Sequence, residues 1–184
     1  MGVMEAMMVT ITPEIETDIP AREALLDRAF GPKRRRKTSE TLRRGRLPAD
    51  GLAFTARDDA GALAGTVRLW DVHAGTAGSA LLLGPLAVDA ARRGEGIGTQ
   101  LMRHALIVAR AYGQRAIILV GDDAYYSRFG FKRLTLPGLA MPGPVDAARF
   151  LGLELEPGAL TGAMGRITAT GRVAPADERR RKTG

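Results

Sequence analysis

The hydrophobic and polar positions along the chain predict an alternation of strands and helices. A helix is expected after Asp18, which would cap it, and Gly31 would end it. A second, short helix is expected at 38–44, with Thr38 or Ser39 as its cap. Strands, marked by period-two alternation or short apolar runs, are expected at 9–11, 52–57, 63–72, 80–88, 115–120, within 150–160 and at 165–172.

The segment 80–88 is almost wholly apolar, which is typical of a strand buried on both faces of a sheet. Gly84-Pro85 interrupts this run. Because proline has no donor N–H and glycine packs weakly in a strand, the pair predicts a bulge or splay where pairing to a neighbouring strand stops. An amphipathic helix that ends at Gly113 follows, and a short helix is expected at 124–129.

Length and composition favour one ordinary globular domain. The chain has 184 residues with 45% hydrophobic and 26% charged positions, and we expect a single domain over 1–174, a loop at 136–144 and a basic polar tail at 175–184. There is no cysteine and there are only two histidines. This excludes disulfides and a thiolate nucleophile, and no metal site is expected.

The formal charge of +7 is concentrated in one segment, because residues 33–46 hold eight basic residues and one acid, Glu40. Such a block is consistent with a solvated loop, since like charges repel. Nucleic-acid binding is the alternative, although the block lacks the interleaved aromatic residues that stack on bases.

No apolar run approaches the roughly 20 residues that a membrane-spanning helix needs. The N-terminal segment has an acid at Glu5 and no basic region before an apolar stretch, so it does not resemble a signal peptide. We therefore expect a cytoplasmic protein without a membrane partner.

The strongest chemical pattern is the sequence Arg93-Gly94-Glu95-Gly96-Ile97-Gly98 between the apolar strand and the amphipathic helix. Glycines allow a ligand to approach the backbone, and a helix N-terminus presents unpaired N–H groups with partial positive charge. The pattern predicts an anion-binding turn. It matches neither the dinucleotide-binding pattern nor the P-loop.

These residues resemble the signature of the GNAT superfamily of acyl-CoA-dependent N-acyltransferases, in which Arg93, Gly96 and Gly98 match the pattern of Arg or Gln, two residues, Gly, one residue, Gly or Ala. The preceding Leu-Gly-Pro-Leu-Ala-Val resembles the splayed fourth strand of that family. The segment 125–131, with its doubled tyrosine and terminal Gly-Phe, resembles the tyrosine helix of a bacterial branch. The likeness covers about 50–135 well.

The resemblance implies an α/β (α+β) domain with a mixed, mostly antiparallel sheet splayed at the fourth strand and helices on both faces. It implies acetyl-CoA as co-substrate. The pantetheine arm would pair with the backbone of Leu86, Ala87 and Val88, and an N–H near Ala87 or Val88 would stabilise the oxyanion. The pyrophosphate would be held by backbone N–H groups of Arg93, Gly94, Glu95, Gly96, Ile97, Gly98 and Thr99.

By the same resemblance, an amine attacks the thioester directly through a tetrahedral intermediate, and Tyr126 is the general acid for the departing thiolate. Many family members place a glutamate on the fourth strand, whereas this chain has Leu81, Leu82 and Leu83 there. The general base therefore stays open between Asp71, His73 and water.

The acceptor is expected to be a primary amine of a small molecule or peptide that the sequence does not identify, and a homodimer stays open. Two alternatives remain. One is a catalytically silent acyl-CoA-binding sensor or interaction module of the same fold, and the other is nucleic-acid binding through residues 33–46. That basic segment also falls where the resembled fold borders the acceptor groove, which would suit an acidic acceptor or the CoA phosphates.

Overall fold

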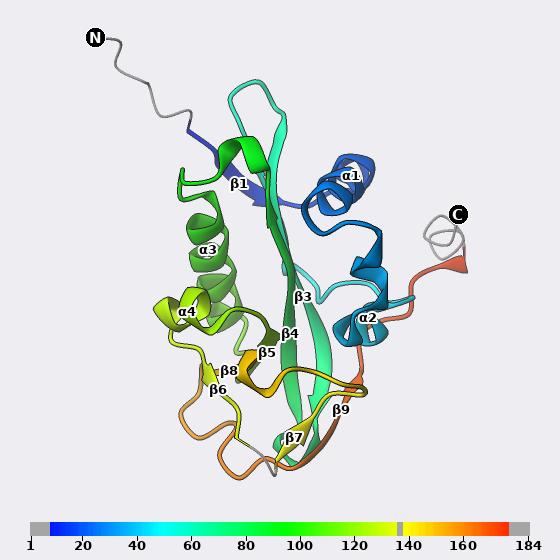
Figure 1. Cartoon of the computed structure of the whole chain (residues 1–184), viewed down its shortest axis with the longest axis vertical. Coiled ribbons are helices and arrows are strands. Elements are labelled where there is room, and N and C mark those ends of the chain that lie inside the picture. The colour runs from blue at the N-terminus through cyan, green and yellow to red at the C-terminus, as the bar shows by residue number, and fades with distance from the viewer. Residues whose placement is uncertain (1–7, 136–137, 177–184) are drawn as a thin grey trace.

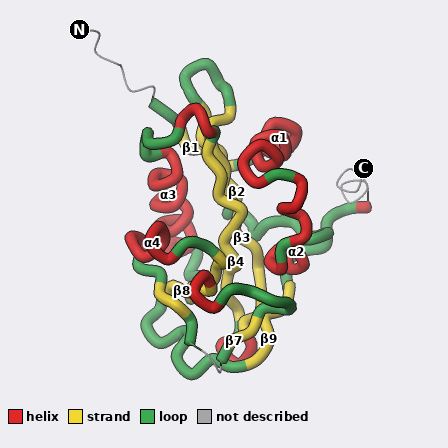
Figure 2. The backbone as a smooth tube through the Cα atoms, in the orientation of Figure 1, coloured by secondary structure: helices red, strands yellow, loops and turns green. Residues whose placement is uncertain are grey.

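The computed structural model describes residues 8–135 and 138–176 as one twisted sheet with helices on both of its faces (Figures 1 and 2). One long amphipathic helix covers one face together with the short tyrosine-bearing helix. Two further helices lie on the opposite face. The helices are α1 (Ile19–Phe30), α2 (Thr38–Arg43), α3 (Ile97–Ala111) and α4 (Asp123–Tyr126).

The strands pair in the order β1-β2-β3-β4-β5-β8-β6. The strand β9 pairs alongside the last residues of β3 and also with β7. Neighbours in the main order are antiparallel except for β4 and β5, which are parallel. The mixed, mostly antiparallel sheet expected from the resemblance is thus confirmed. The strands are β1 (Thr10–Pro13), β2 (Ala53–Arg57), β3 (Leu63–Ala74), β4 (Ser79–Val88), β5 (Ala116–Val120), β6 (Lys132–Arg133), β7 (Leu139–Ala140), β8 (Phe150–Glu154) and β9 (Gly165–Ala169).

The middle of the sheet opens between β4 and β5. Their recorded pairs are Leu81 with Ile117 and Leu82 with Ile118, after which β4 runs on through the cis Gly84–Pro85 bond to Val88 while paired with β3 alone. The splay predicted at Gly84-Pro85 is therefore present. It leaves one edge of the second half of β4 free to pair with something other than β5.

Alternation along the strands divides the core into two layers. Leu69, Leu81 and Ile117 face α3, whereas Trp70 and Leu82 face the side of α1 and α2. The period-two pattern of β3 and the apolar run of β4 thus build one wall that helices cover from both sides.

One predicted helix cap is wrong and the other holds only in position. Lys37, not Thr38 or Ser39, is the N-cap residue of α2, and the Thr38 hydroxyl instead donates to the carbonyl of Pro144, at 2.6 Å. Asp18 is the N-cap residue of α1, as predicted, but its side chain makes no capping bond to the helix, because its carboxylate accepts from the Ile15 N–H at 2.9 Å and also pairs with Arg57. In both cases a tertiary partner takes the side chain that the local sequence would assign to the helix end.

The other differences concern short segments. The expected loop at 136–144 contains β7, and β6 was not expected at all. The basic segment 33–46, expected as a solvated loop around a short helix at 38–44, begins with a 3₁₀ turn at Pro32–Arg36, and the predicted helix is present as α2, which packs beside the sheet.

In the described ranges, no helix is long and apolar enough to span a membrane. Most of the predicted basic tail, 177–184, lies outside the described residues.

Candidate functional site

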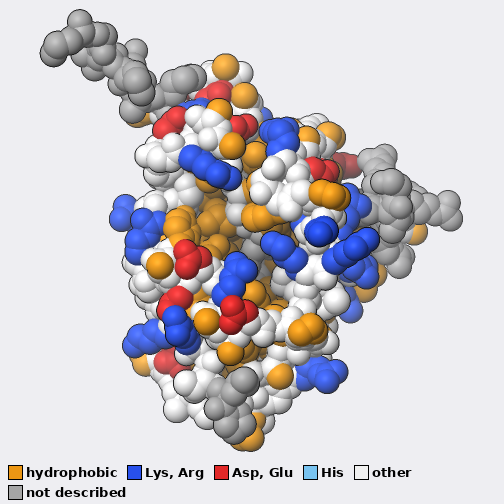
Figure 3. All heavy atoms as spheres, viewed as in Figure 1, with side chains coloured by type: hydrophobic (Ala, Val, Ile, Leu, Met, Phe, Trp, Pro, Cys, Tyr) orange, Lys and Arg blue, Asp and Glu red, His pale blue; other side chains and the backbone are white. Residues whose placement is uncertain are grey.

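A cavity of about 750 Å³ occupies the gap between β4 and β5. In Figure 3 this face of the molecule is hollowed at its centre, with a hydrophobic floor and with Lys and Arg side chains gathered along the side that carries the segment around α2. The volume lies within the range of small-molecule and cofactor pockets. Its lining includes the predicted residues Leu86, Val88, Arg93, Gly98 and Tyr126, together with Phe30, Arg34, Lys37, Ser39, Glu40, Arg43, Leu83, Gly84, Pro85, Val120, Gly121, Asp122, Tyr125 and Arg149.

The glycine loop leads into α3 as predicted. The first helical hydrogen bond runs from the N–H of Gln100 to the carbonyl of Gly96, at 3.0 Å, so the N–H groups of Ile97, Gly98 and Thr99 precede the helical ladder. Gly96 has a φ of +77°, and a Cβ there would meet no heavy atom within 4 Å. The space beside this turn is therefore open to a ligand, and the donors at the helix start suit an anion.

The glycine two residues later has a different reason. A Cβ at Gly98 would lie 2.8 Å from the Tyr125 hydroxyl oxygen, so this residue is small because a side chain packs against it. Arg92 stabilises the loop through ion pairs with Glu95 at 2.7 Å and with Asp58 at 3.6 Å. Glu95 thus holds the loop with its side chain, and only its backbone is left for a ligand.

The three β4 residues expected along the pantetheine arm alternate in direction. Leu86 and Val88 line the cavity, while the side chain of Ala87 is buried against Leu25 and Leu26 of α1. Together with the unpaired edge of β4, this arrangement offers backbone groups and an apolar surface along one side of the cavity.

Tyr126 lines the same cavity from α4. Its ring packs onto Gly121, where a Cβ would come within 2.3 Å of the ring, and meets Tyr125 edge to face with the centroids 4.9 Å apart. Burial, and then the neighbouring Tyr125, raise the pKa of the Tyr126 phenol to about 12. The hydroxyl therefore remains protonated at neutral pH and can act as a hydrogen-bond donor.

A second cavity of about 220 Å³ adjoins the first, and the two share Arg34, Glu40, Arg43 and Pro85 as lining residues. Trp70 forms part of its wall, and the indole N–H of Trp70 donates to the carbonyl of Gly84 at 2.6 Å. This bond satisfies a buried carbonyl at the splay. The two cavities meet at Pro85, so a molecule in one could reach a molecule in the other at that point.

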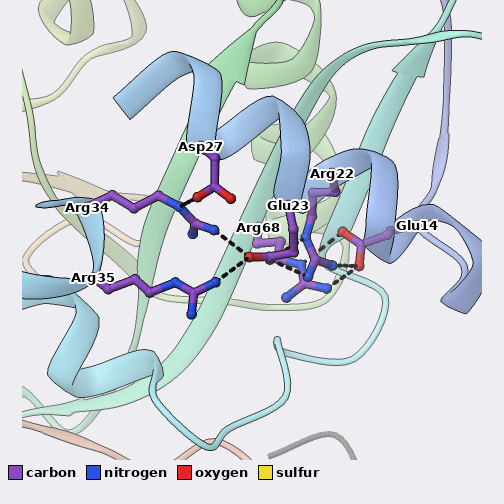
Figure 4. A network of polar contacts seen from close by, with 7 residues as sticks. All are labelled: Glu14, Arg22, Glu23, Asp27, Arg34, Arg35 and Arg68. Carbon is purple, nitrogen blue, oxygen red and sulfur yellow. Dashed lines mark hydrogen bonds and ion pairs between the residues drawn. The ribbon is translucent and has the colours of Figure 1, made fainter. Parts of the chain in front are cut away.

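Beneath the smaller cavity lies a network of paired charges between α1, β3 and the turn before α2 (Figure 4). Arg22 and Arg68 both pair with the buried Glu14, and Arg22 also pairs with Glu23 at 2.8 Å. Burial opposes ionisation of Glu23, but hydrogen bonds from Arg22 and Arg34 hold the pKa of its carboxyl below the ordinary value. The network comprises Glu14, Arg22, Glu23, Asp27, Arg34, Arg35 and Arg68.

The candidate general bases lie elsewhere. Asp71 and His73 sit on the half of β3 that pairs with Leu81 and Ser79 and with β9, and neither lines either cavity. Burial, and then Asp50, raise the pKa of Asp71, which suits a base, but its position does not. Asp122 lines the larger cavity, and its carboxylate caps α4 by accepting from the Ala124 N–H at 3.2 Å.

Several lining residues escaped the sequence pattern. Trp70 and Arg149 carry no local motif, and Lys37, Glu40 and Arg43 were noted only as part of the basic run. Their spacing gave no signal, because β3, α2 and the segment before β8 meet only in the folded chain. Among the described residues, no group of three His, Asp or Glu side chains could hold a metal ion.

Comparisons with known proteins agree with this geometry. Residues 49–133 match the family model of the acetyltransferase (GNAT) domain. An uncharacterized N-acetyltransferase of Escherichia coli K12, YhbS, is 34% identical over 158 residues, which cover 85% of this chain and 93% of the relative.

Two solved structures are similar over nearly the whole fold. The crystal structure of YhbS from Escherichia coli in complex with CoA has a TM-score of 0.74 and 29% identity, covering 100% of this chain and 98% of the other. A GNAT acetyltransferase from Brucella melitensis in complex with acetyl-CoA has a TM-score of 0.59 and 29% identity, covering 92% and 96%. With the strand gap, the glycine turn and the tyrosine helix in place, the chain belongs to the GNAT family of acetyltransferases.

Proposed function

We propose that the protein transfers the acetyl group of acetyl-CoA to the primary amine of an acceptor. The observation that carries this proposal is the larger cavity, because it joins an unpaired β4 edge, an open glycine turn at a helix start and a buried phenol. The β4 edge from Leu86 to Val88 would pair with the pantetheine arm, and the N–H groups from Arg93 to Thr99 would hold the pyrophosphate. The acceptor would approach from the smaller cavity and meet the thioester near Pro85.

In the reaction, the amine nitrogen forms a bond to the acetyl carbon, the carbon–sulfur bond breaks, the nitrogen loses one proton and the sulfur gains one. A backbone N–H near Ala87 or Val88 would stabilise the oxyanion of the tetrahedral intermediate. Tyr126 would donate to the departing sulfur.

The raised pKa of Tyr126 limits what this donation can be. With the phenol at about 12 and a thiol near 8.5, full proton transfer to the thiolate is uphill by roughly 5 kcal/mol. Tyr126 therefore acts mainly by hydrogen-bonding the developing thiolate. The positively charged nitrogen of the tetrahedral intermediate releases one proton to solvent, and the departing thiolate takes one proton from solvent.

The test is thiol release from acetyl-CoA over a panel of primary amines, together with calorimetric titration of acetyl-CoA. Tyr126→Phe should lower kcat by about 100-fold, within the range for loss of a positioned proton donor, while the acetyl-CoA Kd changes little. Tyr112→Phe, at an exposed tyrosine outside both cavities, is the matched control. Acetyl-CoA binding without thiol release from any amine would favour the silent sensor, and equal kcat for Tyr126→Phe would remove its role as donor.

A further inference from the structure

Five cations line the larger cavity; Arg34 is paired with Glu23 and Asp27, and Arg93 belongs to the glycine turn, which leaves three others. They are Lys37, Arg43 and Arg149. In the described residues, no carboxylate lies within ion-pair distance of Lys37 or Arg149, and Arg43 has only Glu40, at 3.6 Å. The Lys37 ammonium lies 4.7 Å from the centre of the Phe30 ring, which carries no compensating charge.

The positive charges of the cluster act on one another, although Lys37 and Arg149 are exposed. Burial, and then the charges of Arg149 and Arg43, lower the pKa of Lys37. Burial also lowers the pKa of Arg43, whose side chain is 9% exposed. Glu40 and Asp122 are the acids that line this cavity, and Asp122 is engaged at the start of α4. The Arg43 guanidinium also donates to the carbonyl and the hydroxyl of Ser39. Positive charges gathered with so few carboxylates are stabilised by a bound anion.

These cations come from two segments that touch each other. Lys37 and Arg43 belong to α2 and its first flanking residue, and Arg149 ends the segment that returns to β8. The Thr38 hydroxyl joins the two segments through its bond to the Pro144 carbonyl. In Figure 1 this returning segment reaches across the front of the sheet to α2. The cluster is therefore held in place by the fold.

The position of the cluster separates it from the turn expected to hold the pyrophosphate. Arg43 lies beside Gly84, since its Nη1 is 3.7 Å from where a Cβ would stand there, and the Arg149 carbonyl accepts from the N–H of Gly121. Gly84 and Val88 are separated by roughly 13 Å of extended strand, at about 3.3 Å per residue, and the glycine turn lies beyond Val88. The cluster thus surrounds the reacting end of the cavity.

We propose that the acceptor is a small amine that also carries an acidic group, a carboxylate or a phosphate, and that Lys37, Arg43 and Arg149 bind that group. This rests on the proposed acetyl transfer. Arginine binds both anions in a bidentate manner, whereas Lys acts as a point charge. The smaller cavity, at about 220 Å³, has room for a compact acceptor beside Pro85.

The first test uses matched amines that differ in charge: 4-aminobutyrate, 4-aminobutanamide and 1-aminobutane, then O-phosphoethanolamine and ethanolamine, with cadaverine as the cationic member. We expect kcat/KM for the anionic member of each set to exceed that of its neutral partner by at least tenfold. The carboxylate and phosphate arms show which anion is preferred. Equal or better use of neutral or cationic amines would overturn the proposal.

Binding provides a readout that does not need turnover. Trp70 is the single tryptophan of the sequence and lines the smaller cavity, so its fluorescence can be followed as these amines, and also butyrate and inorganic phosphate, are added to the CoA-bound protein. Tighter binding of the anions without any thiol release would support the anion site and contradict the proposed acetyl transfer. Thiol release without any preference for anions would support the transfer and contradict the anion site.

The variant pair Lys37→Gln with Arg149→Gln tests the residues themselves, and the exposed pair Lys33→Gln with Arg36→Gln removes the same charge outside both cavities. Loss of the two charged contacts should raise KM for the anionic amine at least tenfold, and the effect on kcat/KM should be several-fold smaller for the neutral partner than for the anionic amine. The control pair should match the parent protein. Equal effects of both pairs, or an effect confined to acetyl-CoA affinity, would refute the assignment.

Discussion

Two groups of cations border the acceptor side of the protein, and they differ in how their charge is balanced. In the network beneath the smaller cavity, Arg22 and Arg68 pair with the buried Glu14, and Arg34 pairs with Glu23 and with Asp27 at 2.7 Å. In the cluster at the junction, Lys37 and Arg149 have no such carboxylate among the described residues, and Arg43 has one at 3.6 Å.

The difference teaches that basic residues that adjoin one another in the sequence can serve opposite purposes. Arg34 and Lys37 are three positions apart in the same basic segment. Arg34 pairs with α1 and so holds it to the turn before α2, whereas Lys37 remains available to a ligand. The role of each basic residue depends on whether a nearby carboxylate already pairs with it.

The largest expected effect comes from removing the carboxylate that the network shares. Glu14→Ala should lower the free energy of unfolding by about 3–5 kcal/mol, because it leaves Arg22 and Arg68 charged, buried and without that partner. Arg149→Ala should change it by less than about 0.5 kcal/mol, as for an ordinary surface residue. Urea denaturation measures both. Similar values for the two variants would erase the distinction between the groups.

An intermediate effect is expected at Trp70, which links the two groups. Arg68 of the network lies over its ring at 5.5 Å from the centre, and its indole N–H donates to the carbonyl of Gly84, beside Arg43. Trp70→Phe should lower the free energy of unfolding by about 1–3 kcal/mol, since it leaves a buried carbonyl without its donor. Circular dichroism during urea denaturation measures this, and a loss under about 0.5 kcal/mol would show that the bond is dispensable.

The smallest effect is a pKa. NMR titration of the lysine Nζ groups should give Lys37 a pKa below the ordinary lysine value, because of partial burial and the charges of Arg149 and Arg43. Between this folded-state pKa and the ordinary pKa of Lys37 in the unfolded chain, the unfolded chain binds more protons than the folded one. The free energy of unfolding therefore rises as pH increases through the folded-state pKa. Saturation with 4-aminobutyrate should return the pKa toward its ordinary value. A pKa for Lys37 at or above the ordinary lysine value would contradict the unbalanced cluster.

Much of the fold could be predicted because its signals are local. Gly84-Pro85 in an apolar strand predicted the splay, and the glycine turn before an amphipathic helix predicted the anion-binding geometry at α3. β6 and β7 were missed because strands of two residues have almost no period of their own. Their partners are distant, as in the pairing of Lys132 with Gly152.

The site divides in the same way. Tyr126, Leu86, Val88, Arg93 and Gly98 were predicted from motifs and do line one cavity. The general base was sought on β3 because nothing in the sequence tells which half of that strand faces the gap. The cation cluster draws on positions more than a hundred residues apart, so only the tertiary structure could reveal it.

The unbalanced cluster also has a consequence for the step at which the acceptor amine loses its proton. The three cations outnumber Glu40 and a single acceptor carboxylate, so a net positive charge remains beside an amine that enters as an ammonium ion, and it favours the deprotonated, nucleophilic form. The proton is then released to solvent when the acceptor binds, before the acetyl group moves. This chain has Leu81–Leu83 where many relatives carry a glutamate, and the charge of the cluster can provide the neutral amine without such a base. The pH dependence of the reaction would then appear in acceptor binding.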